Sequence, residues 1–218
     1  MKIHIFDKSN SLKYMLFDDI YKTIEITGQG LYKEKGSKFI SFAIPVSNEA
    51  DVRRDLEMLR NKYHDARHHC YAYVLGFDKY ASRANDDGEP SGTAGRPILG
   101  QIVSADLTNT LIVVIRYFGG IKLGVSGLIQ AYRAAAREAI GQTSIISRIV
   151  SEMYELEFGY ATMKDVMRII KEESCTILST QFELQNKITI MVRKSDSSLV
   201  YEKFMKLNML TIRCLGTK

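Results

Sequence analysis

Residues 110–141 read TLIVVIRYFGGIKLGVSGLIQAYRAAAREAIG, and this stretch decides the class of fold. The residues from Thr110 to Tyr117 form an almost unbroken apolar run, which is typical of a buried strand. A glycine-rich turn follows, and Ser126 is placed to cap a helix that continues to about Gly141. Apolar side chains recur every three to four residues along that helix, so one of its faces is expected to pack on a sheet. A strand that turns into an amphipathic helix indicates a mixed α and β fold.

The upstream segments extend this pattern. Residues 21–46 predict two or three strands broken by glycines, and Ser47 or Asn48 is placed to cap an amphipathic helix that reaches Tyr63. Residues 68–77 alternate as a strand, and residues 97–105 are expected to form a short helix after a polar loop.

The downstream segments restart the pattern after Ser144. Strand and helix patterns follow in the order βαββαβ, at residues 152–159, 162–173, 175–183, 187–193, 197–207 and 209–215. This order is the split βαβ, or ferredoxin-like, module. We therefore expect two domains, residues 15–146 and 147–218, preceded by an extension over residues 1–14 with Met15 as an alternative start.

Composition narrows the class of protein. Of the 218 residues, 45% are apolar and 25% are charged, which is ordinary for a globular chain. No apolar run approaches the roughly 18 residues of a membrane span, and the first residues lack a signal-peptide core. Three cysteines cannot form a complete disulfide framework. We expect a cytoplasmic protein with no membrane partner. Its net charge of +5 does not by itself establish nucleic-acid binding.

The first chemically informative segment is the loop over residues 85–97, NDDGEPSGTAGRP. Asp86, Asp87 and Glu89 place three carboxylates within four residues, which suits divalent-ion binding or acid–base catalysis. The alternative is structural, because Asp side chains cap turns and glycines adopt positive φ there. The residues leave both interpretations open. The loop lacks the EF-hand pattern, and we expect neither metal nor cofactor.

The second segment is the turn between the strand and the helix. Gly119, Gly120 and Gly124 lie between Arg116 and the helix start, and Lys122 lies among them. A helix start with free N–H groups beside a lysine is suited to anions. The spacing matches neither the P-loop nor the Rossmann fingerprint. The structural alternative is that these glycines permit close packing of the helix on the strand.

A third candidate is a basic ridge on the helix that follows. Gln130, Arg133 and Arg137 share a polar face at helical spacing, and together with Lys122 they could contact RNA phosphates. A solvated helix face is the alternative. Adjacent His68 and His69 would point to opposite faces of a strand, so they do not predict a metal site.

Four stretches resemble the IMPACT/YigZ family. They are residues 37–40 (SKFI), 66–73 (ARHHCYAY), 86–99 and 113–132. The resemblance spans roughly residues 21–215, and the two long motifs are highly specific in combination. One departure is Val125-Ser126, where relatives commonly have two small residues.

The resemblance implies a fold and a function. The first domain should have the two-layer α/β fold of domain IV of elongation factor G and the GHMP kinases, with a left-handed βαβ crossover. The second should resemble the ferredoxin-like C-terminal domain of elongation factor G. Because eukaryotic relatives act in translational control, we expect a non-catalytic regulatory or binding protein that contacts RNA, the ribosome or a translation-associated protein, without DNA specificity. Its expected binding residues are Arg116, Lys122, Arg133, Arg137, Gly119, Gly120, Gly124 and Ser126.

The alternative is an enzyme. In that hypothesis, Asp86, Asp87 and Glu89 face Arg116 and Lys122 in a hydrolase or another phosphate-handling site.

Overall fold

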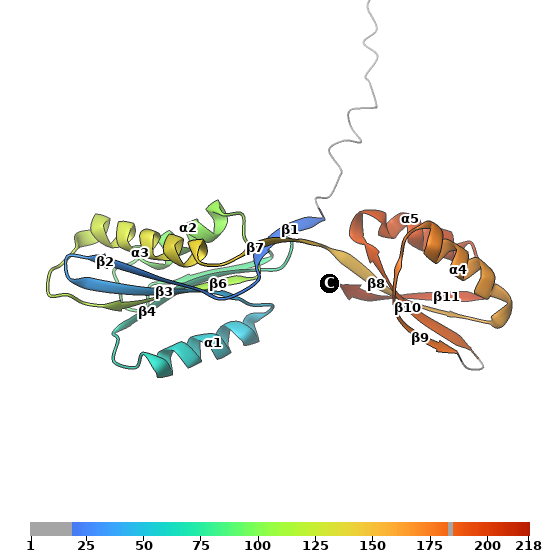
Figure 1. Cartoon of the computed structure of the whole chain (residues 1–218), viewed down its shortest axis with the longest axis horizontal. Helices are drawn as coiled ribbons and strands as arrows, with labels where there is room; N and C mark the ends of the chain where they lie inside the picture. Colours follow the sequence, from blue (N-terminus) through green and yellow to red (C-terminus); the bar gives the residue numbers. More distant parts are fainter. Residues whose placement is uncertain (1–18, 183–184) are drawn as a thin grey trace, which may run out of the picture. The chain divides into compact units, whose positions relative to one another are not determined.

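A computed structural model describes residues 19–182 and 185–218, which divide into two units (Figure 1). The first unit comprises residues 21–148, and the second joins residues 149–218 to residues 19 and 20. The expected extension over residues 1–14 and the alternative start at Met15 lie outside the described residues. Among the described residues, no helix is both long and apolar enough to cross a membrane.

The first unit is built on a five-stranded antiparallel sheet. Its strands lie in the order β2 (Gly28–Glu34), β3 (Ser37–Pro45), β6 (Thr110–Tyr117), β4 (His68–Leu75) and β5 (Ala81–Asn85). The central strand β6 is buried over seven of its eight residues, and the five from Leu111 to Ile115 are all aliphatic, as a strand covered on both faces requires. A separate two-stranded sheet pairs β1 (Ile20–Ile24) with β7 (Ile145–Ile149).

Helices cover both faces of the five-stranded sheet (Figure 1). Helix α1 (Glu49–Lys62) packs Val52, Leu56 and Leu59 on one face. Helices α2 (Gly95–Ser104) and α3 (Gly124–Gly141) pack on the other. The α+β class is confirmed. The unit has three layers, however, where the resemblance implied two, because alternate residues of β4 and β6 bury apolar side chains on opposite faces.

The expected elements of this unit differ from the observed ones at the starts of α2 and α3 and at strands β5 and β7. Asn48 caps α1 as predicted, accepting hydrogen bonds from the N–H groups of Ala50 and Asp51. Helix α2 begins at Gly95, two residues before the expected start. Strands β5 and β7 were not expected, since their short, largely polar or exposed segments carry little strand pattern.

The second unit has the predicted βαββαβ order. Its strands lie in the sheet order β11 (Leu210–Thr217), β8 (Ser151–Phe158), β10 (Asn186–Arg193) and β9 (Thr176–Phe182), and all neighbours are antiparallel. A short 3₁₀ helix, η2 (Tyr160–Thr162), leads into α4 (Met163–Glu172), and α5 (Lys194–Met205) follows β10. Both α-helices contribute to one core, which includes Val166, Ile170, Val200 and Phe204. The ferredoxin-like prediction is confirmed.

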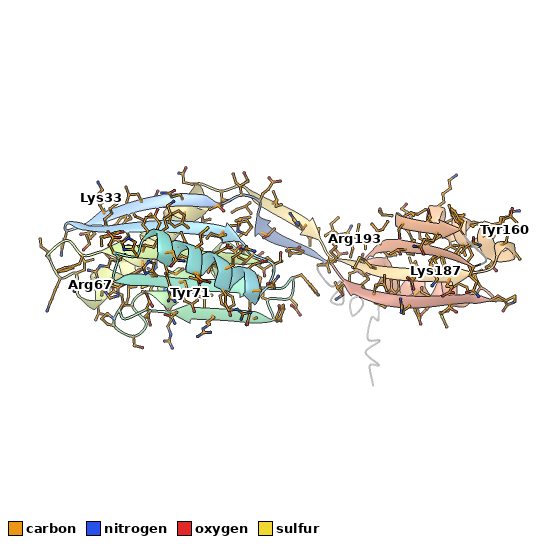
Figure 2. All side chains as sticks on the ribbon, turned by 90° about the horizontal axis from the view of Figure 1, so that it is seen from below. Lys33, Arg67, Tyr71, Tyr160, Lys187 and Arg193 are labelled. Atoms are coloured by element: carbon orange, nitrogen blue, oxygen red, sulfur yellow. The ribbon has the colours of Figure 1, made fainter. Side chains whose placement is uncertain are left out.

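The sheet of the second unit also carries charged cross-strand pairs. Lys187 on β10, labelled in Figure 2, lies 3.6 Å from Glu157 on β8, and Arg213 on β11 lies 2.9 Å from Glu155. Alternate residues of β8 and β10 therefore divide between the apolar core and a polar surface.

Candidate functional site

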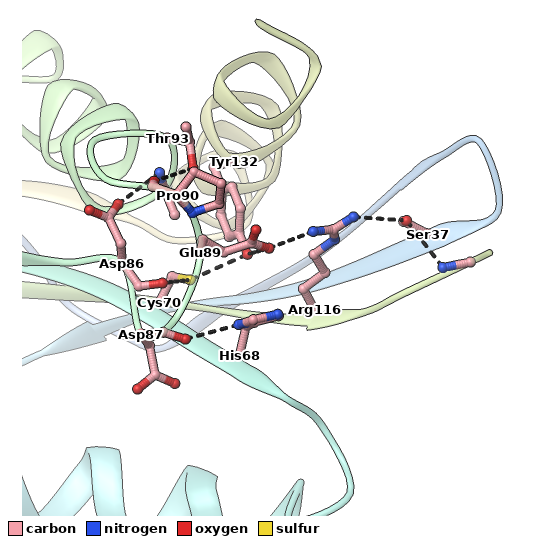
Figure 3. A network of polar contacts seen from close by, with 12 residues as sticks. Ser37, His68, Cys70, Asp86, Asp87, Glu89, Pro90, Thr93, Arg116 and Tyr132 are labelled. Atoms are coloured by element: carbon pink, nitrogen blue, oxygen red, sulfur yellow. Dashed lines mark hydrogen bonds and ion pairs between the residues drawn. The ribbon is translucent and has the colours of Figure 1, made fainter. Parts of the chain in front are cut away.

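The acidic loop (residues 85–97) and the glycine turn (residues 118–123) lie at the same end of the first unit's sheet. In the antiparallel pairing, Arg116 near the end of β6 lies opposite His68 at the start of β4. Asn85 at the end of β5 lies opposite Tyr71 in the same strand β4. Strand pairing thus brings together two loops that are about 30 residues apart in the sequence (Figure 3).

The carboxylate of Asp86 caps the start of helix α2 and does not face an open site. Its carboxylate accepts hydrogen bonds from the backbone N–H groups of Gly92, Ala94 and Gly95, at 2.8, 2.9 and 2.8 Å. These donors lie at the start of α2 and would otherwise lack intrahelical partners. Burial acts to raise the pKa of Asp86, but the three donors hold it below its ordinary value.

Asp87 binds elsewhere. Its carboxylate accepts a hydrogen bond of 2.6 Å from the backbone N–H of His69 and an ion-paired bond of 3.2 Å from Arg60 on α1. Its carbonyl oxygen accepts from the Nδ1 of His68 at 2.9 Å (Figure 3). The chain reaches this position through a left-handed backbone conformation at Asp87, with φ of 42°. Asp87 therefore ties the acidic loop to β4 and α1.

Glu89 is the buried carboxylate of the loop. Its Oε1 accepts hydrogen bonds from Arg116 at 2.6 Å and from the hydroxyl of Tyr132 at 2.9 Å (Figure 3). The side chains of Glu89 and Arg116 are only 4% and 8% exposed, so each charge depends on the other for compensation. Arg116 also reaches Ser37, whose hydroxyl accepts from the N–H of Gly119.

Cys70 and Tyr132 complete this network. The sulfur of Cys70 lies 3.2 Å from the Tyr132 hydroxyl and 3.0 Å from the carbonyl oxygen of Asp86. Burial raises the pKa of both side chains, so both stay protonated at neutral pH. A buried, neutral thiol is a poor nucleophile.

The three carboxylates therefore point to three different sets of partners. Asp86 caps α2, Asp87 holds β4 and α1, and Glu89 pairs with Arg116. Within residues 19–182 and 185–218, no group of three or more His, Cys, Asp or Glu side chains could hold a metal ion.

Glycine is required for different structural reasons at the three glycine positions of the predicted site. A Cβ on Gly119 would lie 1.9 Å from the backbone carbon of Gly36, so this glycine permits two chain segments to touch. Gly120 and Gly124 have positive φ, at 88° and 70°, and a Cβ on either would meet no atom within 4 Å. Gly119 thus allows the glycine turn to pack against the hairpin formed by β2 and β3, whereas the backbone at Gly120 and Gly124 faces open space.

The predicted cap at Ser126 is wrong. Helix α3 begins at Gly124, its N-cap is Leu123, and no side chain caps it. The left-handed φ of Gly124, which glycine adopts freely, lets the chain enter the helix three residues earlier than expected. Ser126 lies in the first turn and lines a small cavity with Tyr32 and Gln130.

The basic residues divide between two places. Lys122 lines a cavity of about 400 Å³ together with Glu89 and Arg116. Arg133 lines a different groove, of about 560 Å³, with Arg96 between α2 and α3. Arg137 lies one helical turn beyond Arg133 and is exposed. The structure therefore places Glu89, Arg116, Lys122 and Gly124 around one cavity, with Arg133 and Arg137 farther along α3.

Sequence patterns did not reveal the part played by Tyr132, Cys70 and Ser37. Cys70 lies in the strand and Tyr132 in the helix that the sequence predicts, and both side chains are fully buried. The signal available for Tyr132 was a hydroxyl within a stripe of alanines, since a buried hydroxyl requires a partner.

Comparisons with known proteins agree on one family. The pattern that defines the Impact N-terminal domain matches residues 35–140. IMPACT family member YvyE of Bacillus subtilis (strain 168) is 30% identical over 182 residues, which cover 84% of each chain. IMPACT family member YigZ of Escherichia coli (strain K12) is 31% identical over 151 residues, 68% of this chain and 74% of that one.

A similar fold is found among solved structures. One crystal structure, described as that of a hypothetical protein, superposes with a TM-score of 0.67 over 91% of this chain and 98% of the other. At 24% identity this likeness concerns the fold alone.

Proposed function

The chain belongs to the IMPACT family, and from that membership we propose that it is a cytoplasmic regulatory or binding protein linked to translation. Its binding surface is the outer face of α3, where Arg133 and Arg137 meet the phosphates of RNA, free or within the ribosome. The link to translation is what the family resemblance implies.

The observation that carries this proposal is that Arg133 and Arg137 are exposed and have no carboxylate partner among the described residues. They are four residues apart on one helix, so their guanidinium groups serve the same side of the molecule. Arg96 and Arg133 line the groove between α2 and α3, which extends the positive charge toward α2. Such an arrangement suits successive phosphates of a nucleic-acid backbone.

The enzyme hypothesis finds less support in the geometry. General acid–base chemistry needs a carboxylate that can reach a substrate proton. Asp86 and Asp87 are instead committed to backbone N–H groups, and Glu89 to Arg116 and Tyr132. Their contacts are those of groups that hold loops and helices in place.

The proposal is tested by affinity capture from a lysate of the source cells, with and without ribonuclease. We expect RNA or ribosomal components to co-purify with the wild type and to be lost after ribonuclease treatment. The double variant Arg133→Glu/Arg137→Glu should recover much less of them while unfolding at the same temperature, because exposed side chains contribute little to stability.

A matched control carries the same change of charge on the opposite face of the sheet. Arg53 and Lys62 are exposed on α1, so Arg53→Glu/Lys62→Glu alters net charge equally. Equal loss in both double variants would indicate a general charge effect and contradict the assignment to α3. Ribonuclease-resistant capture of a protein would contradict RNA as the partner.

A further inference from the structure

The cavity at the N-terminal end of α3 is distinct from the outer face of that helix. It has a volume of about 400 Å³, and its lining includes Glu89, Arg116, Phe118, Lys122, Gly124 and Val125. A few hundred Å³ is typical of sites that hold small ligands. Both the acidic loop and the glycine turn contribute to its wall, which brings charged and apolar groups to one place.

The first electrostatic feature of this cavity is an uncapped helix start. Helix α3 has 18 residues, no side-chain cap and no acidic residue in its first turn. Its first N–H groups lack intrahelical partners and carry the positive end of the helix dipole. Helices α1 and α2 differ, because Asn48 and Asp86 provide acceptors at their starts.

The second feature is independent of the helix. Arg116 lines the cavity although its side chain is only 8% exposed; its terminal nitrogens donate to Glu89 and Ser37, and its buried Nε has no acceptor among the described residues. Lys122 is exposed and forms no ion pair with a carboxylate of the described chain. Glu89 compensates one of these two cations, so the cavity keeps a positive balance that suits an anion.

The third feature is apolar. Phe118 is 53% exposed and Val125 is 60% exposed, although both line the cavity. The guanidinium carbon of Arg116 lies 5.6 Å from the centroid of the Phe118 ring. A half-exposed ring held in this way offers a surface on which an aromatic group can stack.

We propose that this cavity binds a phosphate monoester carried on an aromatic group. The phosphate lies at the first turn of α3 beside Lys122, and the aromatic group lies against Phe118 and Val125. The inference does not rest on the proposed function, because Arg133 and Arg137 do not line this cavity. Two sources share the required chemistry: a free nucleotide-like molecule and the 5′-phosphorylated end of an RNA.

The test is calorimetric titration of the full chain with phenyl phosphate, inorganic phosphate and phenol as probes. Phenyl phosphate should bind more tightly than either of its parts, since only it uses both the charged and the apolar wall. In amide spectra it should shift the signals of Gly124 and Val125. No detectable binding of phenyl phosphate at millimolar concentration would overturn the proposal, as would equal affinity for inorganic phosphate.

Variants locate the site. Val125→Asp places a carboxylate in the first turn of α3, which the helix dipole tolerates but which repels a bound anion. It should abolish binding, whereas Val125→Asn, of similar size and no charge, loses only an apolar contact and should weaken binding far less. Lys122→Gln should weaken binding about tenfold, as loss of a charge-assisted hydrogen bond predicts. The control Lys33→Gln, on exposed β2, should have no effect.

A second pair of probes distinguishes a free small molecule from an RNA end as the source of the phosphate. A short oligonucleotide with a 5′-phosphate is compared with the same sequence ending in a 5′-hydroxyl. If the 5′-phosphorylated oligonucleotide binds more tightly than both its 5′-hydroxyl counterpart and phenyl phosphate, the site is assigned to RNA ends. If phenyl phosphate binds more tightly than the phosphorylated oligonucleotide, the site is assigned to a free small molecule. Unchanged phenyl phosphate affinity in Val125→Asp would overturn the site itself, whether or not Arg133→Glu/Arg137→Glu affects RNA capture.

Discussion

At the scale of single residues, Asp86, Asp87 and Glu89 show how sequence neighbours acquire separate tasks. Their partners lie at sequence separations from 6 residues, for Asp86 with Gly92, to 43, for Glu89 with Tyr132. Local patterns identified the carboxylates as important but could not decide between catalysis and structure. That decision depends on strand pairing, which places β4 and β6 beside the loop.

The cap at Asp86 predicts a pH-dependent contribution to stability. We expect Asp86→Ala to lower the free energy of unfolding by about 1–2 kcal/mol at pH 7, the usual cost of losing a helix cap. The folded-state pKa of Asp86 lies below its ordinary value of 3.8. The stabilisation is therefore fully present above pH 3.8 and is lost as pH falls through the lower folded pKa.

Urea unfolding of wild type and Asp86→Ala at pH 7 and near pH 2 measures this effect. The difference in the free energy of unfolding between wild type and Asp86→Ala should be smaller near pH 2 than at pH 7. Exposed Asp78 serves as a control, and Asp78→Ala should change stability little at either pH. A constant difference across the range would show that the carboxylate charge is not what stabilises α2.

The pair formed by Glu89 and Arg116 predicts strong coupling. Glu89→Gln leaves a buried guanidinium without its counter-charge and should cost about 3–5 kcal/mol. The double variant Glu89→Leu/Arg116→Met removes both charges and should regain much of that loss. Chemical denaturation of Glu89→Leu, Arg116→Met and the double variant forms a thermodynamic cycle. Additive losses would contradict the view that each charge is held by the other.

For helices and strands, prediction from sequence succeeded where the apolar residues of a segment recur with the period of that element. The βαββαβ order of the second unit follows from alternating strands and amphipathic helices, each visible locally. Strand β5, ASRAN, has no such pattern and exists because it pairs with β4. The early starts of α2 and α3 likewise depend on remote or backbone features, namely the Asp86 carboxylate and the left-handed φ of Gly124.

Two glycines in different surroundings should respond oppositely to substitution by alanine. Gly119→Ala should destabilise the first unit strongly, because its Cβ would meet the backbone of Gly36 at 1.9 Å. Gly100→Ala, within α2, places a Cβ where nothing lies within 4 Å and should stabilise by roughly 0.5–1 kcal/mol. Thermal unfolding distinguishes the two. A stable Gly119→Ala protein would contradict the close contact between β-hairpin and turn.

At the scale of the whole molecule, the second unit includes a residue from far upstream. The carboxylate of Asp19 accepts hydrogen bonds from Arg193 at 2.6 and 2.8 Å, and its carbonyl accepts from Val150. Asp19 is only 5% exposed. Sequence patterns could not reveal this contact, because the residues are 174 positions apart.

This arrangement predicts the behaviour of the second unit alone. Residues 148–218 should unfold cooperatively, because they contain the whole of its apolar core. In the full chain, Asp19→Asn should lower the stability of this unit, since Arg193 holds the pKa of the Asp19 carboxyl well below its usual range. Calorimetry and amide spectra check both expectations. A poorly dispersed spectrum of the fragment would mean that the unit needs the rest of the chain.

The central claim, phosphate contact by the outer face of α3, is tested most directly by the salt dependence of RNA binding. Titration of a fluorescent single-stranded RNA at several salt concentrations gives the slope of log affinity against log salt. Each phosphate contact contributes about 0.7 to that slope, so Arg133→Glu/Arg137→Glu should flatten it by roughly 1.4 and weaken binding to unrelated sequences alike. An unchanged slope and affinity in the folded double variant, or no wild-type binding at low salt, would contradict the claim.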